Sequence, residues 1–299
     1  MASLSADLQR PKSSLIEFQK ISTRVLNYLP EVITSEQEFG DYTICSSTAG
    51  GFTKTIRPFH KDIFLRDVSH FEDSFSKLIE LLNQTSSGQR VFPEKDYNIV
   101  DRVIYTIQQS MGIGLDLTVE SNSARKHVGN RFEELIRAIL REMGVAIEKI
   151  VLNIPYESSE GQKFYRCETD IVISPFDAVK STPTYIHPEE IVVSLKTTTK
   201  DRMPKIFIDK ILMSKFLDHE VQVVGISLND IQRKEEANGT KIASTFVSNL
   251  FMVYTKFLTQ LSGYYYLDMP RRALESPFNR HIFRFSQFIL KDIWKLLGS

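Results

Sequence analysis

A segment at residues 190–197 constrains the fold more than any other, because an apolar strand there ends in a single lysine. Side chains alternate between the two faces of a strand, so Ser194 and Lys196 share one face. A helix that begins near Pro204 joins this strand to a second one at 221–228, whose apolar composition is typical of a central strand. Strand, helix and strand in this order predict two parallel neighbours connected by a right-handed crossover.

The rest of the chain adds helices before this sheet and more strands within it. Apolar residues at helical spacing predict helices near residues 15–29, 71–82, 97–112 and 121–143. Turn-forming and basic residues at 46–66 predict an irregular exposed loop. Further strands are expected at 150–154, 164–173 and 264–268, and further helices at 241–261 and 283–297. The whole predicts one α/β domain over residues 1–299, with a mostly helical elaboration at 1–118 and a core at 119–299.

The composition predicts a globular protein that acts in the cytoplasm. Of 299 residues, 42% are hydrophobic and 25% are charged, which suffices for a substantial buried core. No apolar run approaches the ~20 residues that cross a bilayer, and the first residues lack the apolar stretch of a signal peptide. The two cysteines, Cys45 and Cys167, lie far apart, so we expect neither a disulfide framework nor a structural zinc site.

The overall charge gives no sign of a nucleic-acid partner, whereas local charge does. Lysine and arginine number 37, as do aspartate and glutamate, so the net charge is zero. Basic residues nevertheless exceed acidic ones in three stretches, at 54–66, 196–210 and 271–284. Such stretches either contact DNA phosphates or are solvated surface.

An aspartate and a lysine on neighbouring expected strands have the chemistry for phosphodiester hydrolysis. That reaction needs a water nucleophile and neutralisation of the charge on the phosphate, which carboxylate-bound Mg²⁺ and a nearby lysine supply. Asp170 precedes Lys196 by 25 intervening residues, and adjacent strands would bring the two together. The alternative is structural, because a strand aspartate is commonly a turn or salt-bridge residue and a strand-end lysine is commonly solvated.

This arrangement resembles the motif of the PD-(D/E)XK nucleases, in which an aspartate starts one strand and an acidic-x-lysine trio lies on its neighbour. Asp170 and Lys196 match two of its places. The third, two residues before the lysine, is Ser194 here, which departs from the common motif.

With this departure, the sequence resembles a narrower group, the EcoRII-, PspGI- and PfoI-like restriction endonucleases of CCGG and CCNGG sites. Those enzymes carry a relocated acid on the helix after the lysine strand, and Asp209 stands thirteen positions after Lys196. Residues 196–202 look like the group's K-T-T-x-(R/K)-(E/D)-R stretch, and residues 129–133 resemble the helix that supplies a further glutamate, here Glu133.

The resemblance implies a restriction-endonuclease-like α/β fold with a central mixed sheet flanked by helices. It also implies a Mg²⁺-dependent type II restriction endonuclease of a restriction-modification system. Such an enzyme would hydrolyse phosphodiester bonds of double-stranded DNA at a short palindrome with a CCNGG-type, or else a CCGG-type, core. Asp170 and Asp209 would hold the metal, Lys196 would position or activate water, and Glu133 would support the site. A two-fold target implies a homodimer, with a tetramer as the alternative.

Three consecutive charged residues, Lys200, Asp201 and Arg202, which we call the reading triplet, suit the recognition of C·G pairs. Guanine presents N7 and O6 acceptors in the major groove, and cytosine presents its N4 donor. Lys200 and Arg202 can donate to guanine, and Asp201 can accept from cytosine. By the same resemblance, an uninterrupted Lys-Asp-Arg favours a CCNGG core.

Further DNA contacts are expected outside the reading triplet. Gln108 and Gln109, at the expected end of a helix, either donate in the minor groove or are ordinary surface glutamines. The basic candidates for phosphate or flanking contacts are Lys54, Arg57, Arg271 and Arg272.

Two other functions remain open for this sequence. One is a repair or junction-resolving nuclease of the same fold, which would recognise DNA shape and need no reading triplet. The other is a noncatalytic, sequence-specific DNA-binding protein, which leaves the arrangement of Asp170, Lys196 and Asp209 unexplained.

Overall fold

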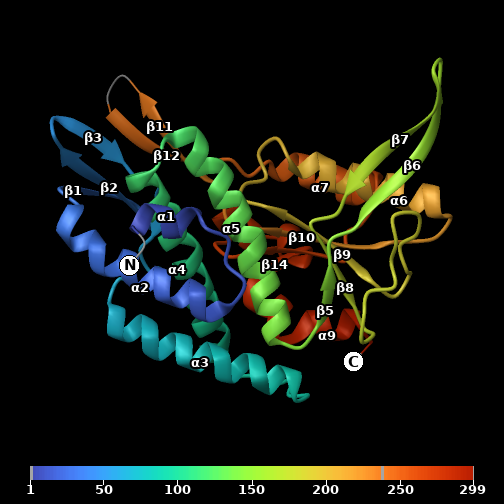
Figure 1. The fold of residues 1–299 in the computed structure, drawn as a ribbon, viewed down its shortest axis with the longest axis horizontal. Coiled ribbons are helices and arrows are strands. Elements are labelled where there is room, and N and C mark those ends of the chain that lie inside the picture. The colour runs from blue at the N-terminus through green and yellow to red at the C-terminus, as the bar shows by residue number, and fades with distance from the viewer. Residues whose placement is uncertain (1–2, 237–238, 299) are drawn as a thin grey trace.

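A computed structural model, which describes residues 3–236 and 239–298, places a mixed six-stranded sheet at the centre of the molecule (Figure 1). The strand order is β14 (Ile282–Arg284), β13 (Gly263–Tyr266), β10 (Gln222–Ser227), β9 (Ile191–Lys196), β8 (Ile171–Ser174) and β5 (Ala146–Glu148). The four strands from β14 to β9 are parallel, and β8 and β5 each pair antiparallel with their neighbour. The predicted α/β class with a mixed sheet is confirmed.

The parallel pair predicted from the sequence is present, and its register fixes the candidate site. Helix α6 (Met203–Leu217) connects β9 to β10, and Ser227 lies opposite Lys196. Gly225 lies opposite Ser194, and a Cβ there would be 2.5 Å from the Tyr264 ring on β13. Glycine is therefore required where this ring packs across the strand.

Helices cover both faces of the sheet and define two apolar cores. Alternate residues of β9 enter different cores, because Ile191, Val193 and Leu195 pack with one cluster and Val192 with the other. The first cluster includes residues of α4 (Glu94–Thr118) and α5 (Ser121–Glu142), and the second includes residues of α6 and α7 (Ser248–Phe257). Residue 196 thus lies at the end of a strand that is held from both sides.

The N-terminal part contains helices α1 (Leu4–Gln9), α2 (Leu15–Val32) and α3 (Val68–Ser86), and also a small antiparallel sheet. Its strands are β1 (Ser35–Phe39), β2 (Tyr42–Ala49), β3 (Phe52–Thr55) and β4 (Phe59–His60). The expectation of an irregular loop at 46–66 is therefore wrong, because much of this segment forms strands. Gly50 and Gly51 have φ of 58° and 79°, so they form the turn of the β2–β3 hairpin.

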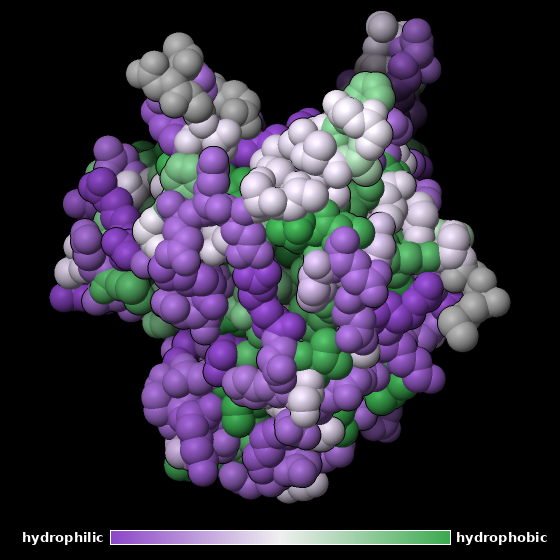
Figure 2. All heavy atoms as spheres, turned by 90° about the vertical axis from the view of Figure 1, so that its left-hand side faces the viewer, coloured by the Kyte–Doolittle hydropathy of each residue, from purple (hydrophilic) through white to green (hydrophobic). Residues whose placement is uncertain are grey.

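Apolar residues of α1, α2 and α3 belong to the same cluster as residues of β8 and β9, so the N-terminal helices share a core with the sheet. The outer face of these N-terminal elements is largely hydrophilic (Figure 2). Among the residues the structure describes, no helix is both long and apolar enough to span a membrane.

Two hairpins project from the edge of the sheet at which β9 ends (Figure 1). One consists of β6 (Val151–Ser158) and β7 (Gly161–Glu168), and the other of β11 (Ile231–Glu236) and β12 (Gly239–Ser244). Both correct the sequence predictions. The expected strand at 164–173 divides into β7 and β8, and the expected helix at 241–261 shortens to α7, because residues up to Ser244 pair with β11 instead.

The closing helix expected at 283–297 is present over residues 285–296. It consists of α8 (Phe285–Gln287), the π-helical η3 (Phe288–Asp292) and α9 (Ile293–Leu296), which follow one another without a break. Two 3-10 turns, η1 (Arg271–Leu274) and η2 (Phe278–Arg280), and the strand β14 precede it.

Candidate active site

Asp170 and Lys196, which we call the strand-end pair, meet at the edge of the central sheet. Asp170 precedes β8, Lys196 ends β9, and these strands are antiparallel neighbours with Ile171 opposite Val193. The Lys196 Nζ lies 3.0 Å from Asp170 Oδ2, and the backbone N–H of Leu195 donates to the same oxygen at 2.6 Å. The adjacent strands thus bring Asp170 and Lys196 together, as expected, and the two side chains form a direct ion pair.

Ser194 occupies the position at which the common motif has an acid. Its Oγ lies 3.0 Å from Lys196 Nζ and 3.5 Å from Asp170 Oδ2. The Lys196 Nζ also donates to the carbonyl oxygen of Leu195 at 2.9 Å. Three acceptors therefore surround the three ammonium protons and fix the direction of the lysine.

Asp209, on α6, lies near the strand-end pair on the face of the sheet toward which Val192 packs. It lines a cavity of about 10 Å³ together with Asp170 and Ser194. Its Oδ2 accepts from Lys205 Nζ at 2.5 Å, whereas its buried Oδ1 has no hydrogen-bond partner among the described residues. Burial, and then the negative charge of Asp209, raise the pKa of the neighbouring Cys167 thiol to about 12.

The unpaired oxygen of Asp209 fits a bound cation. A buried acceptor without a partner costs ~1–3 kcal/mol, and a cation between Asp209 and Asp170 would offset this cost. The cavity has roughly the volume of a single water or ion. Within the described residues, however, no group of three or more His, Cys, Asp or Glu side chains is arranged to hold a metal. Any such ion would therefore have at most these two carboxylates as charged ligands, with water completing its shell.

Glu133, on α5, is half-buried beside the strand-end pair. Burial, and then the negative charge of Asp170, raise the pKa of its carboxyl above the ordinary value. Arg137, one helical turn later, lies 3.3 Å from Glu133 Oε2 and donates to the Asp170 carbonyl oxygen at 2.8 Å. Arg137 thus joins α5 to the site, and sequence reasoning missed it. The available signal was the i, i+4 pairing of Glu133 and Arg137.

The reading triplet lies in the turn between β9 and α6, close to Lys196 in the chain. All three side chains are exposed, and none forms a hydrogen bond or ion pair with any residue that the structure describes. The backbone N–H groups of Arg202 and Met203 both donate to the carbonyl oxygen of Thr199 at 2.9 Å. The side chains are therefore free to contact a ligand, while the backbone beneath them is fixed.

Gln108 and Gln109 lie within α4, which continues to Thr118, so the expectation of a helix end is wrong. Neither is a surface residue, because their exposed fractions are 0% and 1%. Gln108 Nε2 donates to the carbonyl oxygen of Val128. Gln109 Nε2 donates to the hydroxyl of Tyr105, and Gln109 lines a hollow of about 180 Å³ that also borders the β9–α6 turn.

The four basic candidates lie at the surface or near it, and each has a partner. Arg57 lines the same hollow as Gln109 and forms a two-pronged ion pair with Asp116, at 2.8 Å for each bond. Lys54 donates to the carbonyl oxygen of Leu117. Arg271 pairs with Asp41, and Arg272 lies over the ring of Phe278.

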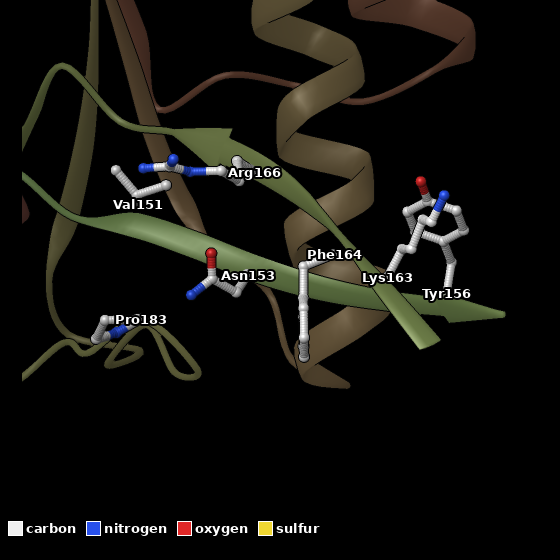
Figure 3. Close-up of a pocket in the computed structure, with 7 residues that line it drawn as sticks. All are labelled: Val151, Asn153, Tyr156, Lys163, Phe164, Arg166 and Pro183. Atoms are coloured by element: carbon white, nitrogen blue, oxygen red, sulfur yellow. The ribbon is translucent and has the colours of Figure 1, made fainter. Parts of the chain in front are cut away.

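A wider hollow, of about 720 Å³, lies along the β6–β7 hairpin (Figure 3). Its lining includes Asn153, Phe164, Lys163 and Arg166 but no carboxylate. Without an acidic ligand it cannot hold a catalytic metal, so size alone does not identify the candidate active site.

Comparisons with known proteins agree with this architecture. No family model and no curated protein matches the chain. Among solved structures, the type IIP restriction endonuclease Kpn2I superimposes with a TM-score of 0.71 and 19% identity, covering 95% of this chain and 92% of Kpn2I. A complex of the restriction endonuclease PspGI with substrate DNA gives a TM-score of 0.41 and 14% identity, covering 76% and 91%. The chain therefore has the fold of the type IIP restriction endonuclease Kpn2I.

Proposed function

We propose that the chain is a Mg²⁺-dependent type II restriction endonuclease that cleaves double-stranded DNA at a short palindrome. One observation carries this proposal. The strand-end pair and the unpaired oxygen of Asp209 converge at a sheet edge from which the unpartnered reading triplet also projects. Hydrolytic and base-reading groups are thus adjacent on a fold that Kpn2I shares.

In this proposal, Asp170 and Asp209 would hold Mg²⁺, which would supply neutralisation of the charge on the phosphate. Lys196 directs its ammonium group toward the same place, where it orients the attacking water and stabilises developing negative charge. Glu133, whose raised pKa favours proton uptake nearer neutral pH, supports the site from α5. Arg137 holds the backbone at Asp170 in place.

The reading triplet recognises consecutive C·G pairs. Lys200 and Arg202 donate to guanine N7 and O6, and Asp201 accepts from cytosine N4. One such triplet per subunit reads one half-site, so a homodimer reads a palindrome with a CCNGG-type or CCGG-type core.

Positive side chains around this edge contact the DNA backbone. Lys54, Arg271 and Arg272 are the cations for phosphate contacts, and Arg57 faces the hollow beside the turn. Gln108 and Gln109 are buried and donate within the fold, so this proposal gives them structural roles. The enzyme would act in the cytoplasm as part of a restriction-modification system.

The test is digestion of a sequenced plasmid with and without Mg²⁺, followed by mapping of the fragment ends. We expect fragments with one defined end sequence, only with Mg²⁺, and none from Lys196→Ala. Lys215→Ala, on an exposed residue of α6, is the matched control and should cut as the unmodified protein does. Cleavage that follows branched or damaged structure would identify a repair or junction-resolving nuclease, and specific binding without cleavage would identify a noncatalytic DNA-binding protein.

A further inference from the structure

A fully buried carboxylate, Asp230, lies beneath the turn that carries the reading triplet. It accepts five hydrogen bonds. Its Oδ1 accepts from the Thr198 hydroxyl at 3.0 Å, the Thr199 backbone N–H at 2.8 Å and the Thr245 hydroxyl at 3.1 Å. Its Oδ2 accepts from the hydroxyls of Thr199 and Tyr266, both at 2.6 Å. Hydrogen bonds to an ionised acceptor are roughly twice as strong as neutral ones.

These donors come from three separate parts of the fold. Thr198 and Thr199 follow β9, Thr245 follows β12 at the base of a projecting hairpin, and Tyr266 ends β13. Asp230 itself lies between β10 and β11. One carboxylate thus fastens the turn to the sheet and to the base of the β11–β12 hairpin.

Thr199 transmits this attachment to the reading triplet. Its N–H and hydroxyl bind Asp230, while its carbonyl oxygen accepts from the N–H groups of Arg202 and Met203 at the start of α6. The side chains of the triplet have no partners of their own among the described residues. Their position relative to DNA is therefore set by this backbone alone.

We propose that Asp230 is a positioning residue that sets the sequence discrimination of the reading triplet. The inference rests on the proposed function, which assigns base reading to the triplet. It adds the residue that positions the triplet. Asp230 touches neither DNA nor metal and acts through Thr198 and Thr199. Because hydrogen bonds to base edges are directional, a small shift of the turn weakens base discrimination more than it weakens hydrolysis.

Asp230→Asn is the primary test because it preserves shape. The amide offers one accepting oxygen in place of two, so the donors at one side of the carboxylate lose their acceptor. Tyr266→Phe removes a single hydrogen bond and keeps the ring, and Thr198→Val removes another while it keeps the side-chain volume.

The neighbouring residue on β13 gives a matched control. The Tyr265 hydroxyl donates to Asp292 Oδ2 at 3.0 Å, and this oxygen also accepts from Gln287 Nε2 at 2.9 Å. Tyr265 packs in the other apolar cluster, on the face of the sheet away from Tyr266. Asp292→Asn and Tyr265→Phe therefore repeat the chemistry of the test variants away from the turn.

The measurement uses the full-length protein with Mg²⁺, a duplex containing the mapped cleavage site, and duplexes with one base pair of that site replaced. Discrimination is the ratio of kcat/KM for the mapped site to kcat/KM for a replaced site, and thermal midpoints are recorded in parallel. We expect Asp230→Asn to lower this ratio about tenfold, with a smaller loss of kcat on the mapped site, and Tyr266→Phe to lower it about threefold. The control variants should keep the ratio within about twofold at comparable losses of thermal midpoint.

An unchanged ratio in Asp230→Asn, or an equal fall in Asp292→Asn, would overturn the positioning role. If Asp230→Asn does not fold, Tyr266→Phe and Thr198→Val decide the question by the same ratio. A native protein that cuts no defined site would instead contradict the proposed function, which the plasmid digestion reveals before any variant is made.

Discussion

The candidate site contains two groups of charged side chains that are held in different ways. In the strand-end pair, Lys196 and Asp170 contact each other and are only 14% and 19% exposed. In the reading triplet, the side chains are exposed and bind none of the described residues, while the backbone beneath them is fastened to Asp230. The first group is fixed by its side chains, and the second is fixed by its backbone.

This difference follows from what each group would do. Hydrolysis requires the same geometry at every phosphate, so its groups can be ordered before DNA arrives. Base reading requires side chains that exchange water for base edges, at a cost of ~0.5–1.5 kcal/mol for each side chain that becomes ordered. A fixed backbone limits this cost because only the ends of the side chains remain to be placed. Variants in the two groups should therefore fail in different ways.

The largest effect is expected at the strand-end pair. Lys196→Ala removes the ammonium group from the site, and we expect a loss of cleavage of about 10³-fold with little change in Kd for the target duplex. Single-turnover cleavage with Mg²⁺ and binding measured without Mg²⁺ separate the two quantities. Native cleavage by this variant would remove Lys196 from the mechanism.

A smaller effect, of the opposite kind, is expected in the reading triplet. Arg202→Ala removes an exposed donor without a partner, so the thermal midpoint should not change. Binding of the target should weaken by about 10- to 100-fold, with less effect on non-specific DNA, since a bidentate contact to guanine carries the discrimination. Competition binding with target and random duplexes measures this ratio. An equal loss on both duplexes would assign Arg202 to a phosphate contact.

Asp209 tests whether the strand-end pair extends to a metal site. Asp209→Asn keeps the size of the side chain but removes its charge, so the Mg²⁺ concentration for half-maximal cleavage should rise by about tenfold or more. Titration of cleavage with Mg²⁺ measures this shift, and Lys205→Ala controls for the loss of the Lys205 ion pair. A titration that matches the unmodified protein would contradict a metal-binding role.

The sequence predicted the parts of the site that depend on local periodicity. The expected neighbouring strands suffice to bring Asp170 and Lys196 together, because Asp170 precedes β8, Lys196 ends β9, and the two strands are antiparallel neighbours. The reading triplet was recognisable from its consecutive charges. Its exposure follows from its place between a strand and a helix.

The groups that orient these residues were not predictable, because they are distant in sequence. Asp230 is separated from Thr199 by 31 positions and lies in a turn with no periodic pattern. The local sequence pattern also gave wrong predictions where strand pairing or burial by distant residues decided the structure. Residues of β7 and β12 pair within hairpins, and Gln108 and Gln109 lie in the part of α4, residues 103–115, that is buried throughout. Tertiary contacts decide these cases, and a single sequence does not display them.

Asp268 is a second buried carboxylate near Asp230. The two carboxylates differ in the number of hydrogen bonds that they accept. Asp230 accepts five hydrogen bonds, whereas Asp268 accepts one from the Tyr42 hydroxyl at 3.3 Å and has a buried Oδ2 without a partner among the described residues. Burial raises the pKa of Asp268 to about 7. The folded state therefore holds a proton that the unfolded state, with an ordinary pKa near 3.8, releases between pH 4 and 7.

The raised pKa of Asp268 gives the smallest of the predicted effects, and it determines the direction in which stability changes with pH. The free energy of unfolding should fall as pH rises from about 4 to about 7, since the charged carboxylate is penalised only in the folded state. Asp268→Asn removes this penalty, so it should be more stable than the native protein at pH 8 by on the order of 1–2 kcal/mol, with a smaller gain at pH 5. Urea unfolding at both pH values measures the difference, and Asp177→Asn, on an exposed residue, is the control. Equal gains at pH 5 and pH 8 would show that the charge of Asp268 is compensated within the fold.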